Sequence, residues 1–184
     1  MNPTPATVAA PGYRPGLWKA DPAHSEIGLS VRMLMVGQVR GRFTRYDATI
    51  VTSDDPLGSS AAATIDLASI DTGNERRDNH LRSADFFEVE TYPTMSYRST
   101  GIRRAGDGWI VGGELTLHGV TRPVPLAVEA SGLGPGRSGG QRAVFSATAQ
   151  INRADFGIDG WSGGGAVVGG QVSVSLRIEA VLRQ

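Results

Sequence analysis

Cysteine is absent from this 184-residue sequence, which excludes disulfides and thiolate chemistry. Arginine supplies nearly all of the basic side chains, because lysine is almost absent too. The 18 basic and 18 acidic residues cancel, so no net field would draw the chain to nucleic acid or to an anionic membrane. No stretch approaches the roughly 20 apolar residues of a membrane span. We therefore expect neither nucleic-acid binding nor stable membrane insertion.

The N-terminus lacks the parts of a signal peptide. Its first basic residue is Arg14, and its longest apolar run is Val8-Ala9-Ala10. Four prolines before residue 16 favour an extended segment without packing partners. The sequence thus predicts a flexible Pro-rich arm over residues 1–16, one domain over residues 17–184, and a cytoplasmic location.

Alternation of apolar and polar residues dominates the rest of the chain. In the last segment the apolar positions fall on one face of an extended chain and the polar positions on the other: Val172, Val174, Leu176, Ile178 and Ala180 against Ser173, Ser175, Arg177 and Glu179. Further strands are expected near residues 60–67, 94–102 and 109–117, separated by turn signals. About eight such strands predict an all-β fold, either a barrel or a sandwich, and their sequential order favours an up-and-down barrel.

One segment has a helical pattern. Thr72 and Glu75 have the spacing of a capping box, and residues 74–83 follow without glycine or proline. Leu81 is its one large apolar residue, so this helix would not be part of the core. We expect it to lie across an end or side of the barrel, anchored by Phe86 and Phe87.

Motifs for catalysis or metal binding are weak. The three histidines, His24, His80 and His118, show no metal-ligand spacing. Asp21, His24 and Ser25 supply the residue types of a hydrolytic triad, but neighbours on a strand point to opposite faces. A polar entrance to a strand is the favoured interpretation. No cofactor is predicted.

Two glycine-rich runs resemble nucleotide-binding loops only in spacing. Gly134, Gly136 and Gly139 match G-x-G-x-x-G, but a strand rather than a helix follows them, which indicates a hairpin loop. The run at residues 163–166 lacks a P-loop lysine. Arg77, Asp78 and His80 on the polar helix have two open interpretations: a solvated face, or donors for an anionic head group.

Many blocks in order resemble the YceI-like family, the lipocalin-like polyisoprenoid-binding proteins. The resemblance covers residues 17–183, and its blocks include residues 18–25 (WKADPAHS), 39–43 (VRGRF), 69–73 (SIDTG), 77–87 (RDNHLRSADFF), 113–124 (GELTLHGVTRPV) and 151–157 (INRADFG). It implies an eight-stranded antiparallel lipocalin-like β-barrel with an elongated cavity, one short crossing helix near residues 77–83, and often a homodimer. It also implies a long-chain isoprenoid or similar amphiphilic ligand, such as a polyprenyl phosphate or an isoprenoid quinone, that is carried or stored rather than chemically changed.

Applied to this chain, the resemblance suggests two sets of ligand-binding residues. The cavity wall is expected from apolar positions: Ile27, Leu29, Val31, Met33, Ile50, Phe86, Phe145, Leu176 and Ile178. A polar head group is expected near His24, Arg77, His80 and Arg153. Two alternatives stay open at this point: the same apolar residues would also form a filled structural core, and His24 or His80 would be needed in a lipid-processing hydrolase.

One departure from the family affects the expected ligand. Many members have Arg-His-Leu where this chain has Arg32-Met33-Leu34. Alternation places residue 33 on the apolar face with Val31 and Met35, so Met33 would remove an inward imidazole. This substitution predicts a less polar cavity wall and favours a lipid with a weakly polar head group.

Overall fold

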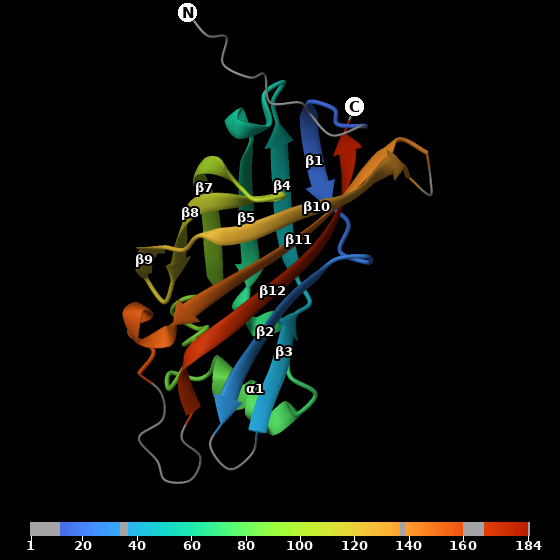
Figure 1. Ribbon diagram of the computed structural model, residues 1–184. Helices are drawn as coiled ribbons and strands as arrows, with labels where there is room; N and C mark the ends of the chain where they lie inside the picture. The colour runs from blue at the N-terminus through green and yellow to red at the C-terminus, as the bar shows by residue number, and fades with distance from the viewer. Residues whose placement is uncertain (1–11, 34–36, 137–138, 160–167, 184) are drawn as a thin grey trace, which may run out of the picture.

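The structure is a computed structural model that describes residues 12–33, 37–136, 139–159 and 168–183. Eight antiparallel strands form a closed barrel (Figure 1). In ring order they are β1 (Gly16–Ala20), β4 (Tyr46–Thr52), β5 (Ser60–Asp66), β7 (Thr94–Ala105), β8 (Gly108–Leu117), β10 (Leu126–Pro135), β11 (Gln141–Asn152) and β12 (Val168–Arg183). Pairing of β1 with β12, from Leu17↔Arg183 to Ala20↔Ala180, closes the ring. This closure confirms the predicted barrel and excludes the open sandwich.

Four further strands extend the barrel. The N-terminal part of β12 pairs with β2 (Glu26–Met33), which continues to β3 (Gly37–Phe43) and β6 (Ile70–Asp71). The strand β9 (Val120–Pro123) pairs with β8. Three 3-10 turns complete the elements: η1 (Pro56–Gly58), η2 (Leu67–Ser69) and η3 (Arg153–Phe156). No helix among the described residues is long and apolar enough to cross a membrane.

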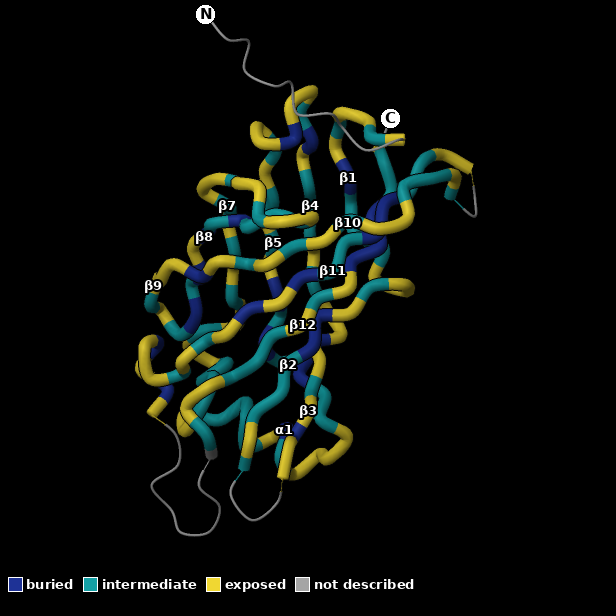
Figure 2. The backbone as a smooth tube through the Cα atoms, viewed as in Figure 1, coloured by how far each residue is buried: buried dark blue, intermediate teal, exposed yellow. Residues whose placement is uncertain are grey.

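The predicted alternation is present in the strands. Along β12, Ile178 and Ala180 are buried, whereas Ser175 and Arg177 are exposed (Figure 2). Glu179 departs from the predicted pattern: it lies on the polar face but is buried, and its carboxylate pairs with Arg142. The three strands expected near residues 60–67, 94–102 and 109–117 are β5, β7 and β8, with ends shifted by a few residues. The predicted hairpin at Gly134–Gly139 joins β10 to β11 through the Pro135↔Gln141 pair.

The helix α1 (Glu75–Arg82) corrects one detail of the sequence analysis. Its N-cap is Asn74, whose side chain accepts a hydrogen bond from the Arg77 amide, and not Thr72. Thr72 instead donates from both its backbone amide and its hydroxyl to Asp78, which is 7% exposed. The capping-box spacing was misleading because a buried carboxylate inside the helix holds the preceding loop.

The end of the barrel beside α1 is filled with side chains. Phe43, Leu67, Ile70 and Phe156 are buried there, and Phe43 and Phe87 have ring centroids 6.0 Å apart. Leu81, Phe86 and Phe87 all pack against this core, as expected for residues that anchor the helix. Figure 1 shows α1 at the end of the barrel opposite the two chain termini.

Three predictions concern residues outside the described part of the chain. Most of the predicted arm (residues 1–11), Met35 and the glycine run at residues 163–166 belong to this group. Within the arm, the Tyr13 hydroxyl donates to the Ser53 carbonyl oxygen at 2.7 Å, and the Arg14 carbonyl oxygen accepts from Thr52. The arm and its boundary at residue 16 stay predictions.

Candidate ligand-binding cavity

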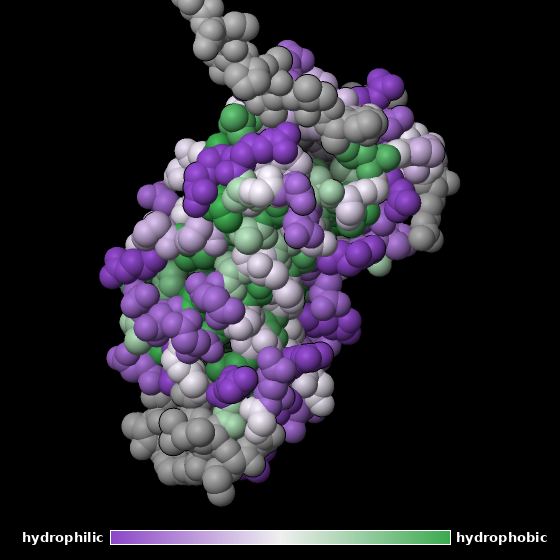
Figure 3. Space-filling model, viewed as in Figure 1, coloured by the Kyte–Doolittle hydropathy of each residue, from purple (hydrophilic) through white to green (hydrophobic). Residues whose placement is uncertain are grey.

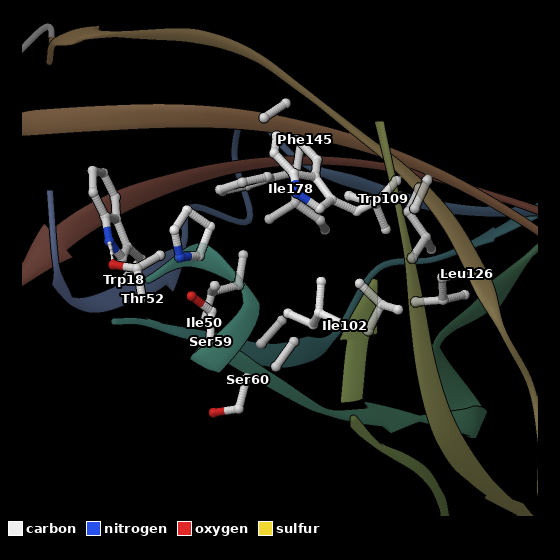
Figure 4. Close-up of a pocket in the computed structure, with 18 of the residues that line it drawn as sticks. Trp18, Ile50, Thr52, Ser59, Ser60, Ile102, Trp109, Leu126, Phe145 and Ile178 are labelled. Atoms are coloured by element: carbon white, nitrogen blue, oxygen red, sulfur yellow. Dashed lines mark hydrogen bonds between the residues drawn. The ribbon is translucent and has the colours of Figure 1, made fainter. Parts of the chain in front are cut away.

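A cavity of about 560 Å³ occupies the half of the barrel away from α1. This volume lies within the roughly 300–1,000 Å³ that is usual for small-molecule sites. Its rim includes residues of η1, of the β7–β8 turn and of the outer end of β10. Most of the deeper wall is apolar: Trp18, Ile27, Ala48, Ile50, Ala61, Ala63, Ile102, Trp109, Val111, Leu126, Val128, Ala130, Phe145, Ala147, Leu176 and Ile178 (Figure 4).

Small side chains on β5 and β11, two strands on opposite sides of the ring, help to create this space. On β5 the inward positions are Ala61 and Ala63 along the cavity, followed by Ile65 in the filled core. On β11, Ala147 lines the cavity, and Ala149 on the same face belongs to the filled core. The step from alanine to larger residues along β5 therefore marks where the hollow part of the barrel ends.

Two polar groups in the wall, on Trp18 and Tyr97, bond to the protein itself. The indole N–H of Trp18, a residue 1% exposed, donates to Thr52 Oγ1 at 2.8 Å. The Tyr97 hydroxyl donates to the Val124 carbonyl oxygen at 3.0 Å, with the Val111 carbonyl oxygen 3.3 Å away. Burial raises the pKa of Tyr97 to about 12, since the charged phenolate would lose its hydration. The inner wall thus presents mainly apolar surface to a ligand.

Gly113 provides the room for Tyr97. A Cβ atom at position 113 would overlap the Tyr97 hydroxyl oxygen and lie 2.8 Å from the Arg98 carbonyl oxygen. The absence of a side chain on β8 therefore lets the phenol ring lie across that strand and reach the two carbonyl groups.

The rim carries the charged side chains of the lining, Arg104 and Asp107. Arg104, on β7, places its guanidinium carbon 5.5 Å from the centroid of the Trp109 ring on β8. Within the described part of the chain Arg104 takes part in no ion pair. The Trp109 indole N–H is buried and has no acceptor among the described residues.

A β-bulge turns Arg104 toward the cavity. Between Ser99 and Gly101 the pairing of β7 with β8 shifts by one residue, so Thr100 is extra. Tyr97 before the bulge and Ile102 after it both line the cavity, although strict alternation would place them on opposite faces. Arg104 and Trp109 were not predicted as site residues because a single sequence does not reveal such a bulge.

Five of the nine predicted wall residues line the cavity: Ile27, Ile50, Phe145, Leu176 and Ile178. The other four, Leu29, Val31, Met33 and Phe86, are not part of its lining. Leu29 and Phe86 pack against the filled core instead. Alternation identifies the inward face of a strand but not the height along the barrel, and beyond Ile27 the strand β2 runs toward the α1 end. Met33 is therefore not in the wall of this cavity, and the preference for a weakly polar head group stays a prediction.

None of the four predicted head-group residues, His24, Arg77, His80 and Arg153, lines the cavity. Arg77 donates to the hydroxyl and carbonyl oxygens of Thr72, and His80 Nε2 lies 2.8 Å from Asp85. Arg153 donates to the carbonyl oxygens of Gly169 and Ile158. Arg77, His80 and Arg153 thus hold the turns around α1 and η3, and a role in head-group binding stays untested for all four.

The residues of the possible hydrolytic triad do not form one. His24 Nδ1 lies 2.9 Å from Asp21 Oδ2, and this contact, with the Ala23 amide, lowers the pKa of Asp21. Ser25 Oγ donates to the backbone oxygen of Glu179 and accepts from its amide. The favoured interpretation, a polar strand entrance, matches this geometry. The described residues also contain no group of three or more His, Asp or Glu side chains that could hold a metal ion.

Comparisons with known proteins agree with this architecture. The family model for the YceI-like domain matches residues 18–180. A UPF0312 protein of Vibrio cholerae is 39% identical over 140 residues, which is 74% of this chain and 73% of that protein. The crystal structure of BcnA from Burkholderia cenocepacia superposes with a TM-score of 0.78 at 24% identity, over 88% of this chain and 99% of BcnA.

A second solved structure is similar in fold. A polyisoprenoid binding domain from Saccharophagus degradans, implicated in plant cell wall breakdown, has a TM-score of 0.67 at 19% identity. The similarity covers 92% of this chain and the whole of that domain. Together with the family match over nearly the whole barrel, these likenesses place the chain: it belongs to the YceI-like domain family.

Proposed function

We propose that the barrel binds the hydrocarbon chain of an isoprenoid or similar lipid in its cavity and carries or stores that lipid without changing it. The observation that carries this proposal is the hollow of about 560 Å³ with its mainly apolar wall. A core filled by its own side chains would leave no such space, so the cavity argues against a purely structural barrel. The polyisoprenoid binding domain of S. degradans, which has the same fold, supports the ligand class.

Hydrophobic transfer is sufficient to bind such a chain. Each buried CH₂ group contributes about 0.8 kcal/mol, so about ten buried carbons contribute roughly 8 kcal/mol. That free energy corresponds to a dissociation constant near 1 μM before the entropy lost on association is subtracted. Directed hydrogen bonds from the inner wall are not needed, which agrees with the satisfied state of Trp18 and Tyr97.

The geometry favours binding over hydrolysis. The Ser25 hydroxyl bonds to the Glu179 backbone rather than to His24, and neither His24 nor His80 lines the cavity. In an assay with prenyl esters we expect no turnover by the purified protein. Turnover that is lost in His24→Ala or His80→Ala would contradict this part of the proposal.

The binding test uses two neighbouring positions on β12. Leu176 lines the cavity, whereas Ser175 is exposed on the outer face. We expect the parent protein to release a long-chain lipid on organic extraction and to bind farnesol and geranylgeraniol in a fluorescence titration. Leu176→Trp should fold and lose this binding, and Ser175→Trp should fold and keep this binding. No binding by the parent protein, or unfolding of Leu176→Trp alone, would refute the proposal.

A further inference from the structure

The lining of the cavity is polar mainly at its rim. Deeper in the wall, Trp18 donates to Thr52, and Tyr97 donates to a backbone carbonyl. At the rim, the Tyr13 hydroxyl is bonded to the Ser53 carbonyl oxygen. The charged side chains of the lining are Arg104 and Asp107, and neither takes part in an ion pair within the described part of the chain.

Stacking on Trp109 fixes where the Arg104 charge lies. The guanidinium carbon is 5.5 Å from the ring centroid, a distance at which the ring attracts the cation. In Figure 4 the Trp109 indole extends from β8 into the cavity, and Arg104, which is also part of the cavity lining, holds its cation next to that ring. Among the described residues, no acceptor and no carboxylate is bonded to this guanidinium, so its donors are available to a ligand. Such a fork matches the oxygens of a phosphate or a carboxylate.

We propose that Arg104 binds the head group of the lipid and that this head group is an oxyanion, a phosphate or a carboxylate. This inference rests on the proposed function, because it requires a lipid in the cavity. The head group would lie at the rim, and the chain would run past Trp109 toward Ile27 and Leu176 in the deeper wall. The polar end therefore lies at the opposite end of the barrel from α1, which carries Arg77 and His80.

Asp107 offers an alternative site at the rim, for a lipid with a positively charged head group. It lies in the β7–β8 turn and also contributes to the rim. A lipid amine would be attracted by Asp107 and repelled by Arg104, whereas an oxyanion would be attracted by Arg104 and repelled by Asp107. We favour the oxyanion because Arg104 is positioned by the Trp109 ring, whereas Asp107 makes no hydrogen bond or ion pair within the described part of the chain.

The test compares charged and neutral head groups on the same chain. Farnesyl phosphate is titrated against farnesol, and palmitate against hexadecanol, with intrinsic fluorescence as the signal. Two of the three tryptophans, Trp18 and Trp109, line the cavity and report its occupation. We expect the oxyanion of at least one pair to bind about tenfold more tightly than its alcohol, an advantage that shrinks with added salt. If the farnesyl pair shows the larger difference in affinity, the preferred head group is a phosphate; if the palmitate pair does, it is a carboxylate.

Two adjacent arginines provide a matched control. Arg104→Gln should remove the advantage of the oxyanion and leave binding of the alcohol within about twofold. Arg103→Gln removes the same charge from the next residue of β7, which the bulge places on the outer face, and should keep the advantage. Asp107→Asn should retain or increase it. Thermal unfolding of each variant confirms that the barrel is intact.

The outcomes separate this inference from the proposed function. Equal affinity of the parent protein for oxyanion and alcohol would overturn the role of Arg104 while leaving a lipid-binding cavity. An equal loss in Arg103→Gln and Arg104→Gln would overturn it as well, since the effect would then be one of net charge. Failure of all four compounds to bind would refute the proposed function itself.

Discussion

Substitution of Ala147 by phenylalanine tests directly whether the barrel is hollow in solution. Ala147 and Ala149 are two residues apart on the inward face of β11, where they pair with Leu176 and Val174 of β12. Both are largely buried, at 7% and 8% exposed. Ala147 lines the cavity, whereas Ala149 is not part of its lining and packs within the hydrophobic core cluster. The same substitution at the two positions therefore adds the same ring to an empty and to a filled environment.

The two variants should differ in stability. In the filled core, the added ring of Ala149→Phe forces neighbours apart and should cost about 1–3 kcal/mol. In the cavity, the ring of Ala147→Phe gains up to about 1.5–3 kcal/mol from leaving water, which offsets any local strain. We expect Ala147→Phe to stay within about 1 kcal/mol of the parent and Ala149→Phe to lose more. Urea unfolding followed by circular dichroism measures both free energies.

Lipid binding should be weakened in Ala147→Phe, the variant that stays stable, and kept in Ala149→Phe, the variant that is destabilised. The ring of Ala147→Phe fills part of the cavity, so the affinity for farnesol should fall at least about tenfold. Ala149→Phe should keep most of its affinity at temperatures where it is folded. If Ala147→Phe is destabilised as much as Ala149→Phe, or binds farnesol as the parent does, the reasoning from the cavity is refuted.

Three further predictions concern the framework of the site. Gly113→Ala should destabilise the barrel by about 2 kcal/mol or more, because its Cβ would meet the Tyr97 hydroxyl and the Arg98 carbonyl oxygen. Gly101→Ala is the control: no atom lies within 4 Å of its new Cβ, so the thermal stability should change little. Asp78→Ala should lower the free energy of unfolding, measured by chemical denaturation, by about 1–3 kcal/mol, since two donors of Thr72 lose their buried acceptor. Asp85→Ala removes the exposed pair with His80 and should lower it by under about 1 kcal/mol. Equal losses in the two variants would contradict the role of Asp78. The free energy of unfolding should fall as the pH rises from about 10 to about 12, because the unfolded phenol of Tyr97 loses its proton before the folded one, and this slope should be smaller in Tyr97→Phe.

Much of the fold was predictable from local patterns in the sequence. Alternation along segments such as residues 172–182 requires strands with one apolar face, and a chain of such strands buries those faces by closing on itself. The polar segment at residues 74–83 has one large apolar residue, so it could only form a helix at the surface of the core. Its N-cap was misassigned because Thr72 donates hydrogen bonds to the buried carboxylate of Asp78, a contact that the capping-box spacing does not show.

The location of the candidate site was decided by the tertiary structure. A strand pattern says which residues point inward but not how far along the barrel axis each one lies, so Leu29 and Met33 were predicted beside Ile27 although only Ile27 lines the cavity. The charged rim was less predictable still. One extra residue at Thr100 reverses the alternation of β7, so Arg104 rather than Arg103 faces the cavity. The sequence by itself determined strands with one apolar face each, because alternation is a property of each strand. Register, bulges and height depend on how strands pair, and only the folded chain decided where the interior is hollow and which charge lies at its opening.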